Sequence, residues 1–165
     1  MIERGKIALR RDVEMAGVAI VAVVAVLLLG QLATFPNLTP WYANLIKPPF
    51  NPPNAVFGPV WTLLYLLMAV AGWRVLRLPP SPARRTALLL FFCQLALNLA
   101  WSWMFFAAHS PLLGLIDILP QWLLIIATIA AFAPLDRAAA WCLTPLMAWV
   151  AYAAVLNAAI WWLNG

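Results

Sequence analysis

The sequence has little charge and few of the side chains that perform catalysis or bind metals. Only 9% of its 165 residues are charged, and it contains one histidine and two cysteines. His109 falls in a short connection, and Cys93 and Cys142 lie in apolar segments without metal-ligand spacing. No nucleophile–base pair or carboxylate pair indicates hydrolysis. These shortages disfavour a metal centre, an axial-histidine haem site and a hydrolase.

Long apolar segments dominate the chain instead. Hydrophobic residues make up 66% of it, against about 45–50% in soluble domains. Each of five segments exceeds the ~20 residues that cross a ~30 Å hydrocarbon core: 13–35, 57–78, 83–107, 111–134 and 138–163. Backbone amides must be paired in lipid, and no segment alternates like a barrel strand. We therefore expect an all-α membrane protein, a single five-transmembrane-helix bundle.

The basic residues lie on one side of this expected bundle. Lys47 alone falls on the other side; the remaining nine are Arg4, Lys6, Arg10, Arg11, Arg74, Arg77, Arg84, Arg85 and Arg137. The positive-inside rule then predicts a cytoplasmic N-terminus and a C-terminus outside. No folded soluble face accompanies the arginines, so we expect no nucleic-acid binding. The first apolar run exceeds the ~7–15-residue core of a cleaved signal peptide, so we expect it to be a membrane-spanning helix and not a cleaved signal.

The connection 37–56 is long enough to expect a function for it. Thr39-Pro40 is a good helix start, which predicts a short helix over 41–46. The following run, KPPFNPP at 47–53, contains four prolines that fix φ and stiffen the chain. A flexible linker would be rich in glycine and serine. The loop is therefore expected to be a structured lid.

The polar and aromatic residues of the spans gather toward the side of this lid. They are Gln31, Trp61, Tyr65, Asn98, Trp101, Trp103, Asp117, Gln121 and Asn157, with Gln94 and Trp149 near mid-depth. Amides and carboxylates are costly in hydrocarbon unless paired, so they should face the bundle interior. Helical spacing supports shared faces for residues 94, 98, 101 and Phe105, and for residues 149, Ala153 and 157. We expect a polar, aromatic-walled cavity beneath the lid.

Other interpretations of these residues remain open. Interfacial anchoring explains Trp41, Trp73, Trp141, Trp161 and Trp162 without a ligand, but it fits Trp61, Trp101 and Trp149 less well. The amides could tie helices together. Asp117 has no titratable partner at its depth, which favours a structural hydrogen bond over a proton relay.

The expected cavity suits a planar, hydrophobic, weakly acidic small molecule. Tryptophan and tyrosine offer flat apolar faces with a polar edge. Lys47, at the expected mouth, could meet a carboxylate of such a ligand.

Several motifs in the chain resemble the TspO/MBR family, which comprises tryptophan-rich sensory proteins and the mitochondrial translocator protein, or peripheral-type benzodiazepine receptor. They are WYxxLxKP at 41–48, GPVWTxxY at 58–65, QLALNxxW at 94–101, Asp117, Trp149 and Leu156-Asn157. They cover the lid loop and the last four apolar segments in the order that the family has.

The resemblance implies a five-helix bundle, usually a homodimer, with its ligand site beneath the 37–56 loop. Family ligands are tetrapyrroles such as protoporphyrin IX, isoquinoline- and benzodiazepine-type drugs, and cholesterol in mitochondrial members. The resemblance implies porphyrin as a ligand of this chain, and no cofactor is expected to be required. Carried over by motif, the site residues are Tyr42, Pro52, Trp61, Tyr65, Asn98, Trp101, Trp149 and Ala153; the spacing argument adds Phe105, Asp117 and Asn157.

The chain departs from the family pattern in two places. No basic residue follows Tyr152, so the cholesterol segment of the mitochondrial members is missing. Pro145-Leu146 stands where many relatives have Pro-Tyr, which removes one expected pocket hydroxyl.

We expect a membrane tetrapyrrole-binding protein that acts as a sensor, carrier or regulator of porphyrin levels. One alternative is light-dependent oxidative breakdown of bound porphyrin, which the resemblance suggests, with Trp61 and Trp149 as redox-active neighbours. A transporter of porphyrin or sterol-like ligands is another. The absence of internal inverted repeats from the sequence weighs against it.

Overall fold

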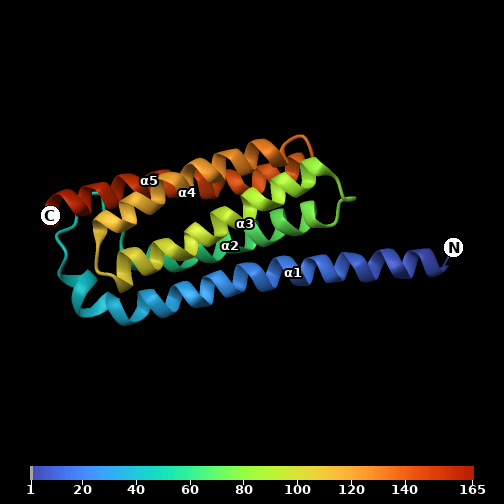
Figure 1. The fold of residues 1–165 in the computed structure, drawn as a ribbon. Coiled ribbons are helices and arrows are strands. Elements are labelled where there is room, and N and C mark those ends of the chain that lie inside the picture. The colour runs from blue at the N-terminus through green and yellow to red at the C-terminus, as the bar shows by residue number, and fades with distance from the viewer. Residues whose placement is uncertain (1) are drawn as a thin grey trace.

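The protein is a bundle of five long helices (Figure 1). The computed structural model describes residues 2–165, with side chains from residue 9 onward, so the side chains of Arg4 and Lys6 lie outside the described part. The helices are α1 (Ile2–Thr34), α2 (Asn54–Leu76), α3 (Pro82–Ser102), α4 (Pro111–Phe132) and α5 (Arg137–Asn164). All five are long and apolar enough to cross a membrane. The predicted five-transmembrane-helix architecture is confirmed.

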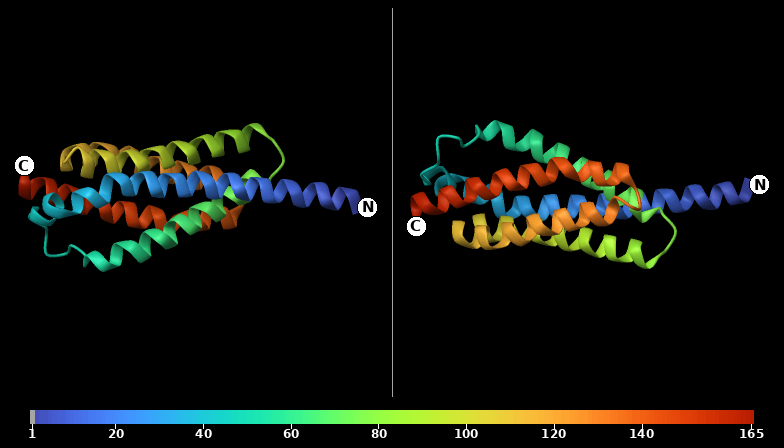
Figure 2. Two further views of the ribbon diagram at one scale, coloured as in Figure 1. Left: turned by 90° about the horizontal axis from the view of Figure 1, so that it is seen from below. Right: turned by 90° about the horizontal axis from the view of Figure 1, so that it is seen from above.

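The helices close into a ring in the order α1–α2–α5–α4–α3 (Figure 2). The N-terminus, the α2–α3 connection and the α4–α5 connection share one end of the bundle, which we call the basic end (Figure 1). The α1–α2 loop, the α3–α4 connection and the C-terminus share the opposite end, which we call the lid end. The order of the ring places α2, α3, α4 and α5 around a common interior.

Local capping explains why three of the helices begin where the sequence predicts. The side-chain oxygens of Ser81, Ser110 and Asp136 accept backbone hydrogen bonds from the first turns of α3, α4 and α5. Proline follows both serines, and its fixed φ suits the first helical position. Helix α1 starts earlier than the predicted apolar span, which begins at residue 13. Its helical backbone also includes the polar residues ahead of that span.

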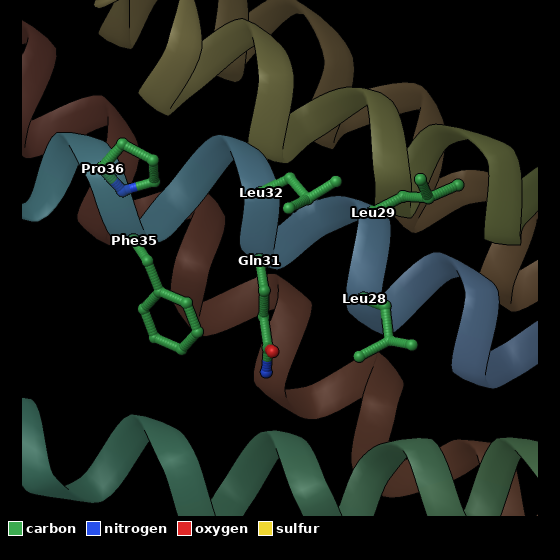
Figure 3. Close-up of a pocket in the computed structure, with 6 residues that line it drawn as sticks. All are labelled: Leu28, Leu29, Gln31, Leu32, Phe35 and Pro36. Atoms are coloured by element: carbon green, nitrogen blue, oxygen red, sulfur yellow. The ribbon is translucent and has the colours of Figure 1, made fainter.

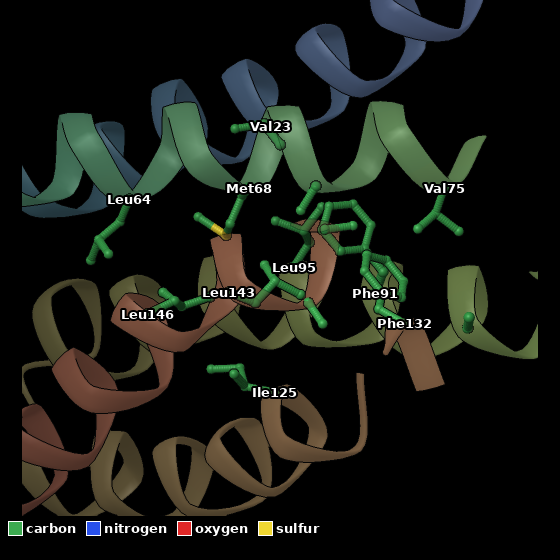
Figure 4. Packing of buried hydrophobic residues seen from close by; sticks show 14 of the residues in the cluster. Val23, Leu64, Met68, Val75, Phe91, Leu95, Ile125, Phe132, Leu143 and Leu146 are labelled. Atoms are coloured by element: carbon green, nitrogen blue, oxygen red, sulfur yellow. The ribbon is translucent and has the colours of Figure 1, made fainter. Parts of the chain in front are cut away.

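Close packing holds the centre of the bundle together (Figure 4). The Phe91 and Phe132 rings stack with centroids 5.8 Å apart, and both side chains are fully buried. A Cβ added at Gly72 would lie 2.9 Å from the Phe91 ring, so the glycine allows α2 to approach α3. Lipid tails are as apolar as the helices, so the hydrophobic effect does not drive the helices together in a membrane. Close packing of complementary shapes drives their association instead.

Ion pairs fasten the basic end. Arg74 binds the Asp136 carboxylate through Nε and Nη2 at 3.0–3.1 Å, and Arg77 pairs with Asp12 at 3.3 Å. Partial burial raises the pKa of Asp136. Hydrogen bonds from the Ala139 backbone and Arg74, with the charge of Arg74, outweigh this effect and hold the pKa below its ordinary value. These pairs join α1 to α2 and α2 to the start of α5.

Candidate ligand site beneath the lid

The lid begins with a short helical segment, Leu38–Tyr42, whose helical backbone runs on to Asn44 and which Lys47 caps. Helical backbone ends at Asn44, so the predicted helix over 41–46 is wrong in its extent. The Lys47 ammonium caps this end: its Nζ donates to the carbonyl oxygens of Tyr42 (2.6 Å), Leu45 (3.1 Å) and Ala43 (3.3 Å). Its three N–H groups are thereby engaged, and Nζ also lies 4.5 Å from the centroid of the Tyr42 ring. Lys47 therefore positions Tyr42 and is not free to meet a ligand carboxylate in this state.

The middle of the lid is fastened to α5 at two points. The Asn164 side chain accepts a hydrogen bond from Ile46 N–H and donates one to Ile46 C=O, both at 2.9 Å. Tyr152 Oη donates to the Phe50 carbonyl oxygen at 2.6 Å. Sequence reasoning missed both contacts, because their lid partners are backbone groups that carry no residue signature. The lid is thus held in place by the helix that carries Trp149 and Ala153.

Four of the predicted site residues meet at the lid end, around Phe105. Its ring stacks on Trp101, with centroids 5.0 Å apart and planes 16° apart, and lies 6.3 Å from the ring of Tyr42. Asn157 locks this group: its Oδ1 accepts from Trp101 Nε1 at 3.1 Å and its Nδ2 donates to Pro111 O at 2.7 Å. Residues from the lid, α3, the helical segment Trp103–Ala107 and α5 therefore form one cluster, which ring contacts and the hydrogen bonds of Asn157 hold together.

Two further groups of predicted residues lie on α2, α3 and α5. Tyr65 Oη donates to Asn98 Oδ1 at 2.7 Å, and the Trp61 ring is 5.5 Å from that of Tyr65. Trp149 contacts the rings of Phe57 (5.9 Å) and Tyr152 (5.8 Å), neither of which was predicted. Tyr152 follows Trp149 by three residues, and this helical spacing was the signal in the sequence that could have placed the two rings side by side. Among the predicted residues, five are only half-buried and pack against the same core: Trp61, Tyr65, Trp101, Trp149 and Ala153.

Five polar side chains of α3, α4 and α5, which we call the polar seam, are buried. Each of the five is at most 4% exposed: Gln94, Asn98, Asp117, Gln121 and Asn157. Within the described residues, Asp117 Oδ2 and Gln94 Oε1 are buried without a hydrogen-bond partner, so the hydrogen bond expected for Asp117 is not found at that oxygen. Pro52 is half-buried in the lid. No ring contact or hydrogen bond joins Pro52 or Asp117 to the aromatic residues in the part of the chain described.

Comparison with known proteins finds one family over nearly the whole length of the bundle. A family model described as the TspO/MBR family matches residues 18–163, from α1 to the end of α5. The chain is 40% identical over 131 residues to the tryptophan-rich protein TspO of Chlorobaculum tepidum, covering 75% of this chain and 79% of that one. It is 38% identical over 149 residues to TspO of Archaeoglobus fulgidus, covering 88% and 94%. It is 37% identical over 123 residues to the translocator protein of Homo sapiens, covering 73% of each chain.

Proposed function

The chain belongs to the TspO/MBR family, and we propose that it binds a planar, hydrophobic tetrapyrrole of the protoporphyrin IX kind beneath the lid. The observation that carries this proposal is the set of half-buried aromatic residues, Trp61, Tyr65, Trp101 and Trp149, that surrounds one core below a fastened lid. Because the polar seam is buried more deeply, the aromatic faces are what the walls offer to a ligand. Flat rings of this kind stack on a conjugated macrocycle.

The hydrogen bonds of the polar groups would hold the aromatic walls in place for the ligand. Tyr65 and Asn98 hold each other, and Asn157 holds Trp101, so the walls are fixed before a ligand arrives. Fixed walls reduce the ordering entropy that binding costs. The acidic groups of the ligand would face the lid end, because a carboxylate is costly in hydrocarbon. There a carboxylate could replace one of the three carbonyl oxygens on Lys47.

The proposed role is that of a sensor, carrier or regulator of porphyrin levels. The basic end, which carries Arg77, Arg84 and Arg137, would face the cytoplasm, and the lid and C-terminus would face outside. The homodimer that the family resemblance implies stays a prediction, as does contact with membrane lipid at the exposed leucines.

A dark titration of purified protein with protoporphyrin IX tests this proposal. In detergent, the porphyrin absorbance should shift saturably with one site per chain. A linear change equal to that of protein-free micelles would contradict the proposal. The saturated complex is then illuminated. Stable absorbance supports binding alone, whereas bleaching faster than in micelles supports the alternative of light-dependent breakdown.

A further inference from the structure

A pocket of about 310 Å³ lies against the lid-end half of α1. Its volume falls at the lower end of the range of about 300–1,000 Å³ seen for ligand sites. Figure 3 shows that Leu28, Gln31 and Phe35 point across the pocket toward α2, with α5 behind. The lining is otherwise apolar, and consists of Leu29, Leu32 and Pro36.

The packing of α1 explains why its lid-end half stands away from α2. At the basic end the two helices are close, because Asp12 pairs with Arg77 and a Cβ at Gly72 would lie 3.7 Å from that of Ala19. At the lid end α1 packs on α3 instead, where a Cβ at Gly30 would lie 3.3 Å from Ser102 Oγ. Both views in Figure 2 show α1 and α2 diverging toward the lid end. The pocket therefore lies along α1 at the level where the two helices diverge.

The two ways into the bundle differ in what blocks them. On the side that faces water, the lid covers the bundle. Hydrogen bonds of Asn164 to Ile46 and of Tyr152 to Phe50 hold it in place. On the membrane side, the pocket along α1 is lined only by residues of α1 and of the turn that follows it: leucines, a phenylalanine, a proline and the half-buried amide of Gln31. Apolar side chains change rotamer without breaking a hydrogen bond. Helix α5, which lies behind the pocket, also carries Trp149 and Ala153.

We propose that the pocket along α1 is the mouth of a lateral portal between α1 and α2, through which a membrane-dissolved planar amphiphile reaches the site from the lid-end half of the bilayer. The proposal rests on the proposed function and adds the route that the ligand takes. The fastened lid then retains the bound ligand and is not its entrance.

A portal residue should change the rates of binding and release together and leave their ratio unchanged. Leu28→Trp, which narrows the opening, should lower both rate constants for protoporphyrin IX by about tenfold, with Kd unchanged. Leu28→Ala should raise both. The matched control is Leu123→Trp, because Leu123 is 61% exposed on α4 and Leu28 is 55% exposed. Stopped-flow mixing of protein-containing vesicles with porphyrin-loaded vesicles measures both rates, and circular dichroism checks the fold of each variant.

Two results would overturn the portal. If wild type binds saturably but both Leu28 variants match the Leu123→Trp control in both rates, the opening is not the route, and the proposed function stands. If Asn164→Ala raises the association rate while the Leu28 variants do not change it, the lid is the entrance. Absence of saturable binding by the wild type would overturn the portal and the proposed function together.

Discussion

Gly114→Ala should damage both the stability of the bundle and its site. A Cβ at this position of α4 would lie 2.8 Å from Asn157 Oδ1 and 2.9 Å from a ring carbon of Phe105. Neither neighbour can yield cheaply, because Asn157 is held by Trp101 and Pro111, and Phe105 is stacked on Trp101. The added methyl group must therefore break this cluster or separate α4 from α5.

The cost of Gly114→Ala can be estimated from its parts. Overpacking a tight interior costs about 1–3 kcal/mol. Loss of the two Asn157 hydrogen bonds costs about 0.6 kcal/mol each in a membrane protein. Alanine regains about 1 kcal/mol through its better helix propensity. The last two effects nearly cancel, so we expect a net loss of about 1–3 kcal/mol.

Two other glycines supply the controls for Gly114→Ala. Gly17→Ala meets nothing within 4 Å and should not destabilise the protein. Gly72→Ala clashes with Phe91 at 2.9 Å on α3, so it should destabilise the bundle without weakening porphyrin binding. Thermal unfolding in detergent, followed by circular dichroism, measures the stability, and a dark porphyrin titration measures the affinity. If Gly114→Ala is as stable as Gly17→Ala and binds porphyrin normally, the described Phe105–Asn157 packing is wrong.

Three further predictions concern the lid, the basic end and the topology. Replacing Pro52 and Pro53 with glycine should loosen the lid and weaken porphyrin binding by about 1–2 kcal/mol, or roughly 5–30-fold. The loss should come mainly from faster dissociation, with the helical circular dichroism unchanged; an unchanged dissociation rate would make the loop a simple connector. Because the pKa of Asp136 is lowered in the folded protein, its ionised form contributes stability above its unfolded pKa of about 3.9, and this stability is lost as the pH falls through the folded value. Asp136→Asn keeps the helix cap, so its melting temperature should fall less than that of wild type between about pH 7 and pH 3, and an equal fall would refute the ion-pair contribution. A reporter fused to the C-terminus should be active only outside the cytoplasm, whereas cytoplasmic activity would reverse the orientation.

The sequence was sufficient to predict the helices and the residues that face the interior. Apolar length alone located five spans, and the caps at Ser81, Ser110 and Asp136 explain why the predicted starts agree with the structure. The cost of burying amides in lipid placed Asn98 and Asn157 inside the bundle. Their burial to at most 4% exposure confirms that placement.

The remaining features depend on contacts that residue types do not specify. Asn164 binds the backbone of Ile46, and Lys47 turns back onto three carbonyl oxygens, so neither role follows from spacing along a helix. The divergence of α1 from α2 comes from small residues that meet different neighbours at its two ends, Gly30 against Ser102 and Ala19 against Gly72. Periodicity shows which face of a helix is buried but not against which helix it packs.

Porphyrin affinity of three tryptophan variants tests the central claim most directly. Trp61→Ala and Trp149→Ala remove half-buried faces, and each should weaken binding of protoporphyrin IX by about 1–3 kcal/mol, roughly 5- to 150-fold. Trp162 is 80% exposed near the end of α5, and Trp162→Ala should leave the affinity nearly unchanged. Dark equilibrium titrations of the three variants and wild type in the same detergent give the comparison. Equal losses in all three variants, or no loss in the first two, would contradict a site walled by these aromatic residues beneath the lid.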